Sequence, residues 1–305
     1  MNTAIPNIDY QAVLAENIRQ QRRVAFNPAK RYLDGVTSLP PAPMLVTELL
    51  ALFREPDYDV DRVVQLITYE PSLTAQILRL CNSASFAGQR PPDDIFEAVS
   101  RIGFYQVYCM VVSLLGARTK SMEGVDEGLN VNELCRHSVA AAVSAGVMAD
   151  ETGQTKASAF TAGLLHDIGR LVLASVERGR YAALIQKATD EGLLLTDLER
   201  AVLMMDHAEV GGELMQRWNL PPEIVAAVRR HHDPSVGPPY EQLTAAVQLG
   251  DVIGHQFFDE DLAGTDLLTF SAAALDTLHL TPDDFPRLLA KVQSEMDQVK
   301  VMLEI

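Results

Sequence analysis

Apolar residues recur along most of this chain every three or four positions, which places them on one face of an α-helix. No segment shows the strict apolar–polar alternation that is typical of a half-buried β-strand. In the N-terminal half the spacing predicts helices over residues 10–25, 44–54, 60–69, 71–83, 93–101 and 104–118. The fold class that follows is all-α, a bundle of many helices.

Helical spacing continues through the C-terminal half, where it predicts helices over residues 131–150, 157–176, 222–232, 241–258 and 282–303. Two capping boxes, in which the N-cap side chain and an acid three residues later each bond the other's backbone, predict two more helix starts. One comprises Thr196 and Glu199, and the other comprises Asp206 and Glu209. The second box places His207 in a first helical turn.

Residues 121–130 mix glycine with acidic residues and interrupt the helical spacing, so they predict a boundary between two helical units. We expect an N-terminal helix over residues 1–32, an N-terminal helical subdomain over 33–125 and a second helical subdomain over 126–305. The helix predicted over 131–150 is rich in alanine and glycine, which lets neighbouring helices approach it closely.

The composition is that of a folded helical protein. Of the 305 residues, 48% are hydrophobic, which is enough for a large core, and only 6% are aromatic. Because 41 acidic residues outnumber 25 Lys and Arg residues, the net charge of −16 repels nucleic acids and anionic membranes. We therefore expect neither as a partner. A small phosphorylated ligand stays compatible with this charge, since bound cations can reverse the local field.

The cysteines and the apolar segments predict a cytoplasmic location. Cys81, Cys109 and Cys135 are widely spaced in apolar stretches without a CxxC pair, which is typical of reduced buried thiols. The N-terminal residues lack the basic and apolar segments of a secretion signal. The most apolar stretch, 107–115, is too short to span a bilayer.

His166 and Asp167 are adjacent in an otherwise apolar segment and are the centre of the candidate chemistry. A buried ionised aspartate is destabilising unless it is paired or bound to a cation. Imidazole and carboxylate together suit a divalent transition metal. The alternative is an ordinary ion-paired couple at a helix surface, and the dipeptide alone does not choose between the two.

Other residues with metal-binding side chains are ambiguous when taken singly. Glu133 and His137 are four residues apart and share a helix face, where an exposed hydrogen bond is the simpler interpretation. His231 and His232 are about 100° apart around a helix axis. They reach one pocket only if the helix ends there or if two metals share them.

Asp251 follows an apolar helical stretch, in which a lone carboxylate needs a partner. His255 lies one turn beyond it, and His279 stands alone further along the chain. We interpret both of these histidines as structural residues.

Short motifs along the chain resemble the HDOD domain. They are Glu-Pro-Ser-Leu-Thr at 70–74, Leu-Cys-Asn-Ser-Ala at 80–84, Leu-Leu-His-Asp-Ile-Gly at 164–169 and Trp-Asn-Leu-Pro at 218–221. The resemblance covers roughly residues 33–235. It implies an all-α, multi-helix HD-domain-like bundle over 126–305 with an N-terminal helical HDOD subdomain over 33–125. HDOD domains are relatives of the HD phosphohydrolases and occur in bacterial signalling, which implies a protein partner in a signalling pathway.

The HD-GYP cyclic-dinucleotide phosphodiesterases, which are active HD relatives, indicate what such a pocket would hold. Their ligands are a His, a His-Asp pair, another His, a His-His pair and a late Asp, and some add a Glu one turn before the first His. The residues that match by resemblance are Glu133, His137, His166, Asp167, His207, His231, His232 and Asp251. Arg170 replaces a lysine of those enzymes, and residues 233–240 lack their Gly-Tyr-Pro signature. Both departures argue against cyclic-dinucleotide hydrolysis.

The resemblance implies two divalent transition-metal ions, and mixed nitrogen and oxygen ligands suit iron, manganese or nickel. We expect Asp167 to bridge the two ions and to be a catalytic residue together with Arg170, which can hold a phosphate by forked hydrogen bonds. The expected ligand sets are His137, His166 and Asp251 for one ion and His207, His231 and His232 for the other.

Three functions follow from this pocket. The first is a regulatory signalling module that binds metal and a phosphorylated ligand without efficient turnover. The second is an active metal-dependent phosphohydrolase, in which two ions lower the pKa of a water and hold a phosphoryl oxygen. The third is a metal-free helical scaffold. The missing Gly-Tyr-Pro signature favours the first over the second, and the ligand set argues against the third.

Overall fold

The computed structural model describes residues 28–34, 60–82, 90, 92, 94–102, 129–233, 237–256 and 267–303. These residues form helices and contain no β-strand, which confirms the all-α prediction. The helices predicted over 10–25, 44–54 and 104–118 lie outside the described residues, as does most of the boundary predicted at 121–130.

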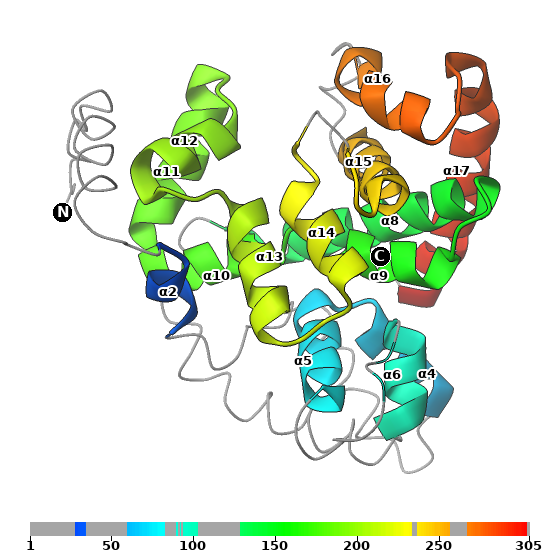
Figure 1. Ribbon diagram of the computed structural model, residues 1–305, viewed down its shortest axis with the longest axis horizontal. Coiled ribbons are helices and arrows are strands. Elements are labelled where there is room, and N and C mark those ends of the chain that lie inside the picture. Colours follow the sequence, from blue (N-terminus) through cyan, green and yellow to red (C-terminus); the bar gives the residue numbers. More distant parts are fainter. Residues whose placement is uncertain are drawn as a thin grey trace.

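Three short helices form an N-terminal layer, which lies at the bottom of Figure 1: α4 (Val60–Thr68), α5 (Pro71–Cys81) and α6 (Ile95–Ile102). They pack against one another as their apolar spacing predicts, and α5 and α6 also contact α9 of the bundle above. The buried Glu70 carboxylate caps α5, because it accepts hydrogen bonds from the Ser72 hydroxyl at 2.8 Å and the Leu73 N–H at 2.5 Å.

The described part of the bundle consists of α8 (Val131–Glu151), α9 (Lys156–Leu165), α10 (Ile168–Glu177), α11 (Gly179–Glu191), α12 (Leu195–Leu203), α13 (His207–Arg217), α14 (Pro222–Arg230), α15 (Glu241–Gln256), α16 (Leu267–Thr277), a 3₁₀ turn η3 (Pro282–Asp284) and α17 (Phe285–Leu303). The short helix α2 (Pro28–Leu33) packs on α10 and α13. The apolar spacing misses α2, α11 and α16; α11 buries only Tyr181 and Leu184, so its surface is mostly polar.

Helix α8 is the centre of the bundle and packs most extensively against α15 and α9. Small residues permit this approach, as the composition of α8 predicts. A Cβ on Gly250 of α15 would lie 2.6 Å from the Ala141 carbonyl oxygen of α8, and one on Gly163 of α9 would lie 2.9 Å from the Ala142 Cα. The helices that carry His137 and Asp251, and the one that ends just before His166, therefore pack backbone against backbone.

The single helix predicted over 157–176 is two helices, α9 and α10, which meet at His166 and Asp167. The Arg170 N–H donates to the Asp167 carbonyl oxygen at 2.9 Å, an i to i+3 bond that starts the second helix. In an unbroken helix two adjacent side chains point about 100° apart. The break lets both side chains enter the interior, where both are buried.

The same stretch, Lys156–Glu177, is the one part of the described chain that is long and apolar enough to cross a membrane. In the structure, 83% of its most apolar window is buried inside the protein. Such burial is typical of a segment in the core of a folded protein. Cys81 and Cys135 are buried, as predicted, whereas Cys109 lies outside the described residues.

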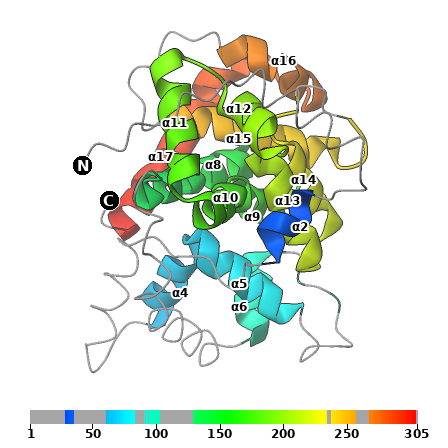
Figure 2. The ribbon, with the colours of Figure 1, turned by 90° about the vertical axis from the view of Figure 1, so that its left-hand side faces the viewer.

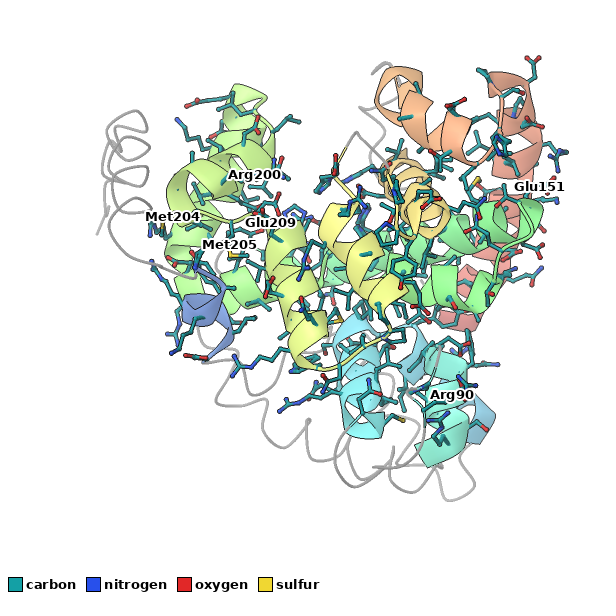
Figure 3. The ribbon with its side chains drawn as sticks, in the orientation of Figure 1. Arg90, Glu151, Arg200, Met204, Met205 and Glu209 are labelled. Atoms are coloured by element: carbon teal, nitrogen blue, oxygen red, sulfur yellow. The ribbon has the colours of Figure 1, made fainter. Side chains whose placement is uncertain are left out.

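Two views place the N-terminal layer below the bundle, with α17 along one side (Figures 1 and 2). Ion pairs attach α17 to this side: Arg287 and Lys291 contact Glu151 at the end of α8, and Lys156 of α9 contacts Glu295. Figure 3 shows Glu151 on the opposite side of the molecule from the α12–α13 junction, where Arg200 and Glu209 lie. The candidate site lies between these two sides.

Candidate metal centre

Separate helices bring seven of the eight predicted ligands together. Those seven are His137 on α8, His166 and Asp167 at the α9–α10 break, His207 at the start of α13, His231 and His232 at the end of α14, and Asp251 on α15. The described residues contain four overlapping groups of candidate ligands. Within each group, the ligand atoms all lie within 4.8 Å of one another. Each of the seven residues belongs to at least one group. Metal binding itself stays a prediction.

One half of the cluster surrounds the Asp251 carboxylate. Asp251 Oδ1 lies 3.0 Å from His137 Nε2 and 3.3 Å from His166 Nε2, and these two nitrogens are 3.1 Å apart. This is the first of the two ligand sets that we expect from the sequence. All three residues are buried.

The other half surrounds Asp167. Its Oδ1 lies 3.1 Å from His207 Nε2 and 3.8 Å from His231 Nε2, while His232 Nε2 is 2.9 Å from His207 Nε2. Asp167 Oδ2 faces the first half and lies 3.7 Å from His166 Nε2. The two oxygens of one carboxylate therefore face two histidine groups, which is the geometry that a bridging ligand needs.

Two of the imidazoles are oriented by the backbone. His166 Nδ1 is 2.6 Å from the Gly163 carbonyl oxygen, and His231 Nδ1 is 2.7 Å from that of Val228. Because a carbonyl only accepts, each Nδ1 carries a proton, and burial keeps His231 neutral with Nε2 as an acceptor. His231 Nε2 is buried and has no hydrogen-bond partner. A buried imidazole nitrogen that is fixed in this way and has no partner fits a metal ligand.

The end of α14 explains how adjacent histidines reach one cluster. The helix ends at Arg230, and His231 is its C-cap. His232 therefore follows the chain out of the helix instead of continuing around its axis. This satisfies one of the two conditions that the sequence left open.

The structure does not bring Glu133 to the cluster. Its side chain is exposed in the first turn of α8, and it belongs to none of the four groups. Its backbone N–H donates to the Asn130 side chain at 3.2 Å, which caps the helix. The one-turn spacing to His137 is present, but the helix start turns this carboxylate toward solvent.

Charges inside the cluster oppose the effect of burial. Burial alone would raise the pKa of Asp167, but His166, Arg170 and His207 lower it well below its usual value. Burial would likewise raise the pKa of Asp251, and hydrogen bonds from His137 and His166 lower it. Both carboxylates are therefore ionised, which is the form that binds cations.

The histidines divide into two protonation classes. Burial lowers the pKa of His231 well below its usual value and lowers that of His232 to about 4, with neighbouring histidines adding to the effect. Burial would also lower the pKa of His207, but Glu199 and Asp167 on either side raise it to about 10. Without metal, His207 thus holds a proton that a cation has to displace.

Glu199 is a site residue that the sequence misassigns. Helix α12 begins at Leu195 without a side-chain cap, so the capping box predicted for Thr196 and Glu199 is wrong. Glu199 is instead buried; its Oε2 lies 2.7 Å from His207 Nδ1, and its Oε1 accepts from the Tyr181 hydroxyl at 2.7 Å. The capping box of Asp206 and Glu209 is present, as predicted.

The position of Glu199 has a detectable signal in the sequence. It follows Leu198 and precedes Val202 on the buried face of α12, where an acid needs a partner. The carboxylate orients the His207 ring so that Nε2 faces Asp167. Ligating histidines are commonly held by a carboxylate in this manner.

A cavity of about 270 Å³ opens beside the cluster. One wall is polar and includes Asp167, Arg170, His232 and His255, and the other is formed by apolar side chains of α11 and the α11–α12 connection, such as Ile185. Arg170 Nη1 donates to Asp167 Oδ2 at 2.9 Å. The cavity thus places a cationic fork next to the candidate metal ligands.

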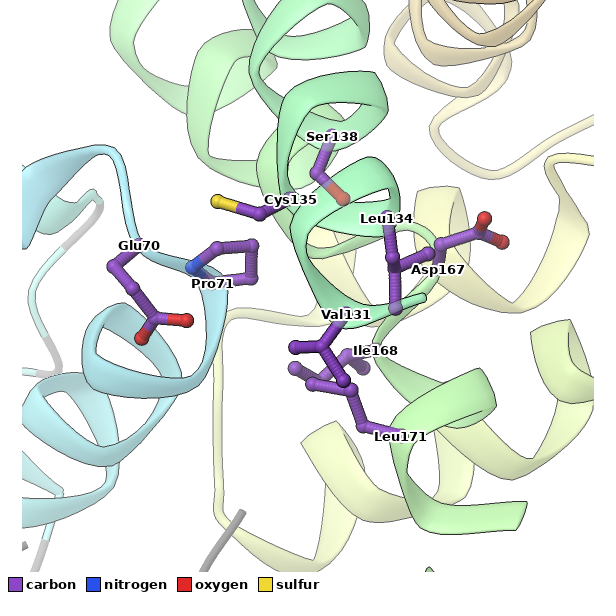
Figure 4. Close-up of a pocket in the computed structure, with 9 residues that line it drawn as sticks. All are labelled: Glu70, Pro71, Val131, Leu134, Cys135, Ser138, Asp167, Ile168 and Leu171. Atoms are coloured by element: carbon purple, nitrogen blue, oxygen red, sulfur yellow. The ribbon is translucent and has the colours of Figure 1, made fainter. Parts of the chain in front are cut away.

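A much smaller cavity of about 10 Å³ lies on the other side of Asp167, between α5, α8 and α10. Figure 4 shows Pro71 and Cys135 on one side of this space. Asp167 lies on the other side, and its carboxylate points away from the space. The N-terminal layer therefore contacts the back of the site, while the ligand atoms face the larger cavity.

A family model of the HDOD domain matches residues 39–234, close to the range of 33–235 over which the motifs resemble that family. This match covers more than half of the chain. The chain belongs to the HDOD family. The prediction of the family is confirmed, and so is its helical fold.

The HDOD protein is similar to parts of two longer bacterial proteins. An uncharacterized protein of Treponema pallidum (strain Nichols) is 26% identical over 79% of this chain and 46% of its own length. Ribonuclease Y of Lawsonia intracellularis (strain PHE/MN1-00) is 28% identical over 64% of this chain and 30% of its own length. The HDOD chain thus spans less than half the length of either relative.

A solved structure covers more of the HDOD chain. The MmoQ response regulator of Methylococcus capsulatus (strain Bath) superimposes with a TM-score of 0.66 and 28% identity, over 84% of this chain and 99% of that chain. The HDOD fold therefore occurs in a response regulator of nearly the same extent.

Proposed function

We propose that this HDOD protein is a cytoplasmic bacterial signalling module that binds two divalent transition-metal ions, with Asp167 as the bridging ligand. The observation that carries the proposal is the buried His231 Nε2, which has no hydrogen-bond partner and is aimed at the Asp167 carboxylate. A metal-free scaffold would leave this nitrogen unsatisfied, at a loss of roughly 1–3 kcal/mol. A bound cation satisfies it.

The cavity beside the cluster supports a phosphorylated ligand. Arg170 presents a guanidinium at the polar wall, and forked donors of this kind match phosphate oxygens. The apolar wall around Ile185 fits a carbon-rich part of the same molecule. When bound, the two cations would supply Lewis-acid stabilisation of charge on a phosphoryl oxygen.

A signalling partner is supported by the similarity to the MmoQ response regulator. The net charge of −16 repels nucleic acids and anionic membranes, which disfavours both as partners. The burial of Lys156–Glu177 agrees with a core segment and not with a membrane span.

Metal content tests the proposal. Protein purified without a histidine tag is expected to hold about two iron, manganese or nickel ions per chain. Elemental mass spectrometry measures this content. Chelation is expected to lower the free energy of unfolding by about 4 kcal/mol for each ion removed, if the metal had been present at a thousand times its dissociation constant. Protein that holds no metal and unfolds at the same temperature with and without chelator would favour the metal-free scaffold.

Metal affinity is expected to rise with pH. The pKa of His207 near 10 means that a proton occupies this ligand at neutral pH in the metal-free protein, and a cation has to release it. At pH values below that pKa, release of one proton makes the metal affinity rise about tenfold for each pH unit. Competition with a metal indicator at pH 6, 7 and 8 measures the slope. An affinity that stays flat over this range would contradict the displacement of a proton.

Hydrolysis of phosphoesters is the second candidate function. It is supported by the position of Arg170 beside the cluster and by the similarity to Ribonuclease Y. The test is a panel of nucleoside phosphates, cyclic dinucleotides and short RNA incubated with metal-loaded protein. Release of product that Arg170→Ala abolishes would favour an enzyme, whereas binding without product would favour the regulatory module.

A further inference from the structure

We propose that His255 is a further ligand of the cation that His137, His166, Asp251 and the bridging Asp167 would hold. The inference rests on the proposed metal binding and adds a residue that lies outside the family's ligand pattern. In this chain His255 takes the role that the resemblance assigns to Glu133.

The first argument is distance. His255 lies one turn after Asp251 on α15, and its Nε2 is 3.5 Å from Asp251 Oδ1. The ligand atoms of His137, Asp251 and His255 all lie within 4.8 Å of one another. Two ligand atoms bound at about 2.1 Å to one cation at a tetrahedral angle are about 3.4 Å apart, so the spacing suits a shared ion.

The second argument is the packing of α15 against α8. A Cβ on Gly254 would lie 3.3 Å from Nδ1 and Cε1 of the His137 ring, so the α15 backbone touches this imidazole directly. The next residue, His255, then places its ring centroid 4.2 Å from that of His137, at an interplanar angle of 35°. The glycine thus brings the two imidazoles beside the same carboxylate.

The third argument is the contrast with other residues. Glu133 shares a helix with His137 but is exposed and outside every ligand group. His279, the other histidine outside the family pattern, is also in none of the groups. The His255 side chain is 46% exposed and lines the 270 Å³ cavity, so it lies where the cluster opens to solvent. At this position, a molecule that enters the cavity could replace the His255 imidazole on the cation.

The experiment compares metal content and affinity in four proteins purified without a tag: wild type, His255→Ala, His255→Gln and the control His279→Asn. Wild type and His279→Asn are expected to retain two ions per chain through dialysis. Both His255 variants are expected to lose one ion, or to bind it about tenfold to hundredfold more weakly. Cobalt substitution adds a second readout, because removal of an imidazole changes the visible absorption of the bound ion.

The outcomes separate the two proposals. If wild type holds two ions and both His255 variants hold two with unchanged affinity and cobalt spectrum, His255 is not a ligand and the inference is overturned, while metal binding stands. If wild type holds none, the proposed function fails and the inference fails with it. Circular dichroism of the variants checks that the half-exposed substitution leaves the helices intact.

Discussion

Replacement of Asp167 by asparagine is expected to remove both metal ions from the protein. The two oxygens of this carboxylate face different histidine groups: Oδ1 lies 3.1 Å from His207 Nε2, and Oδ2 lies 3.7 Å from His166 Nε2. Asparagine keeps the shape but removes the charge and replaces one acceptor with a donor. We expect a loss of more than a hundredfold in affinity for each ion, measured as metal per chain after dialysis.

The control for this variant is Asp276→Asn, which changes an exposed aspartate on α16. It alters the net charge by the same amount and is expected to leave the metal content at the wild-type value. Equal metal content in Asp167→Asn and wild type would mean that the ions, if present, do not depend on the bridging carboxylate. The arrangement proposed around Asp167 would then be wrong.

Replacement of Gly169 by alanine is expected to destabilise the whole bundle. A Cβ at this position would lie 2.0 Å from the His207 carbonyl oxygen and 2.8 Å from the Gly211 backbone nitrogen. Both neighbours are backbone atoms, so α10 and α13 would have to move apart. Overpacking of this kind lowers the free energy of unfolding by about 1–3 kcal/mol or more, well above the gain of roughly 1 kcal/mol in helix propensity. Urea unfolding measures the difference.

Gly179→Ala is the matched control, because no atom lies within 4 Å of a Cβ built there. It lies at the start of α11 and is expected to leave the stability unchanged or to raise it slightly. Since the displaced carbonyl belongs to His207, Gly169→Ala is also expected to bind metal more weakly. An unfolding midpoint equal to that of wild type would contradict the close packing of α10 on α13.

The sequence predicts the fold well wherever a helix has an apolar face. The helices α4, α5, α6, α8 and α15 lie within a few residues of the predicted ranges. The apolar spacing does not reveal the break between α9 and α10, because the segment is apolar on both sides of His166 and Asp167. At this point both polar side chains have to face the other residues of the cluster, and an unbroken helix would not turn both of them inward.

The candidate site is predicted less evenly. The resemblance names seven residues that the structure brings together, and it also names Glu133, which helix α8 turns toward solvent. Glu199 and His255 are missed for different reasons. Glu199 matches a local capping pattern although its partner lies eight residues away, and His255 stands outside any motif although it shares the one-turn spacing with Asp251.

His137 and Asp251 are direct neighbours in space, yet 114 positions separate them along the chain. During synthesis, α8 through α14 leave the ribosome before α15 exists, so His137 and His166 lack the Asp251 carboxylate at that stage. If the proposed metal binding holds, the ion of this half can be fully coordinated only after residue 251 has been translated, whereas the ligands around Asp167 are already present. A chain that is interrupted before α15 would keep Asp167 with His207, His231 and His232, the proposed ligands of the other ion, but would lack Asp251.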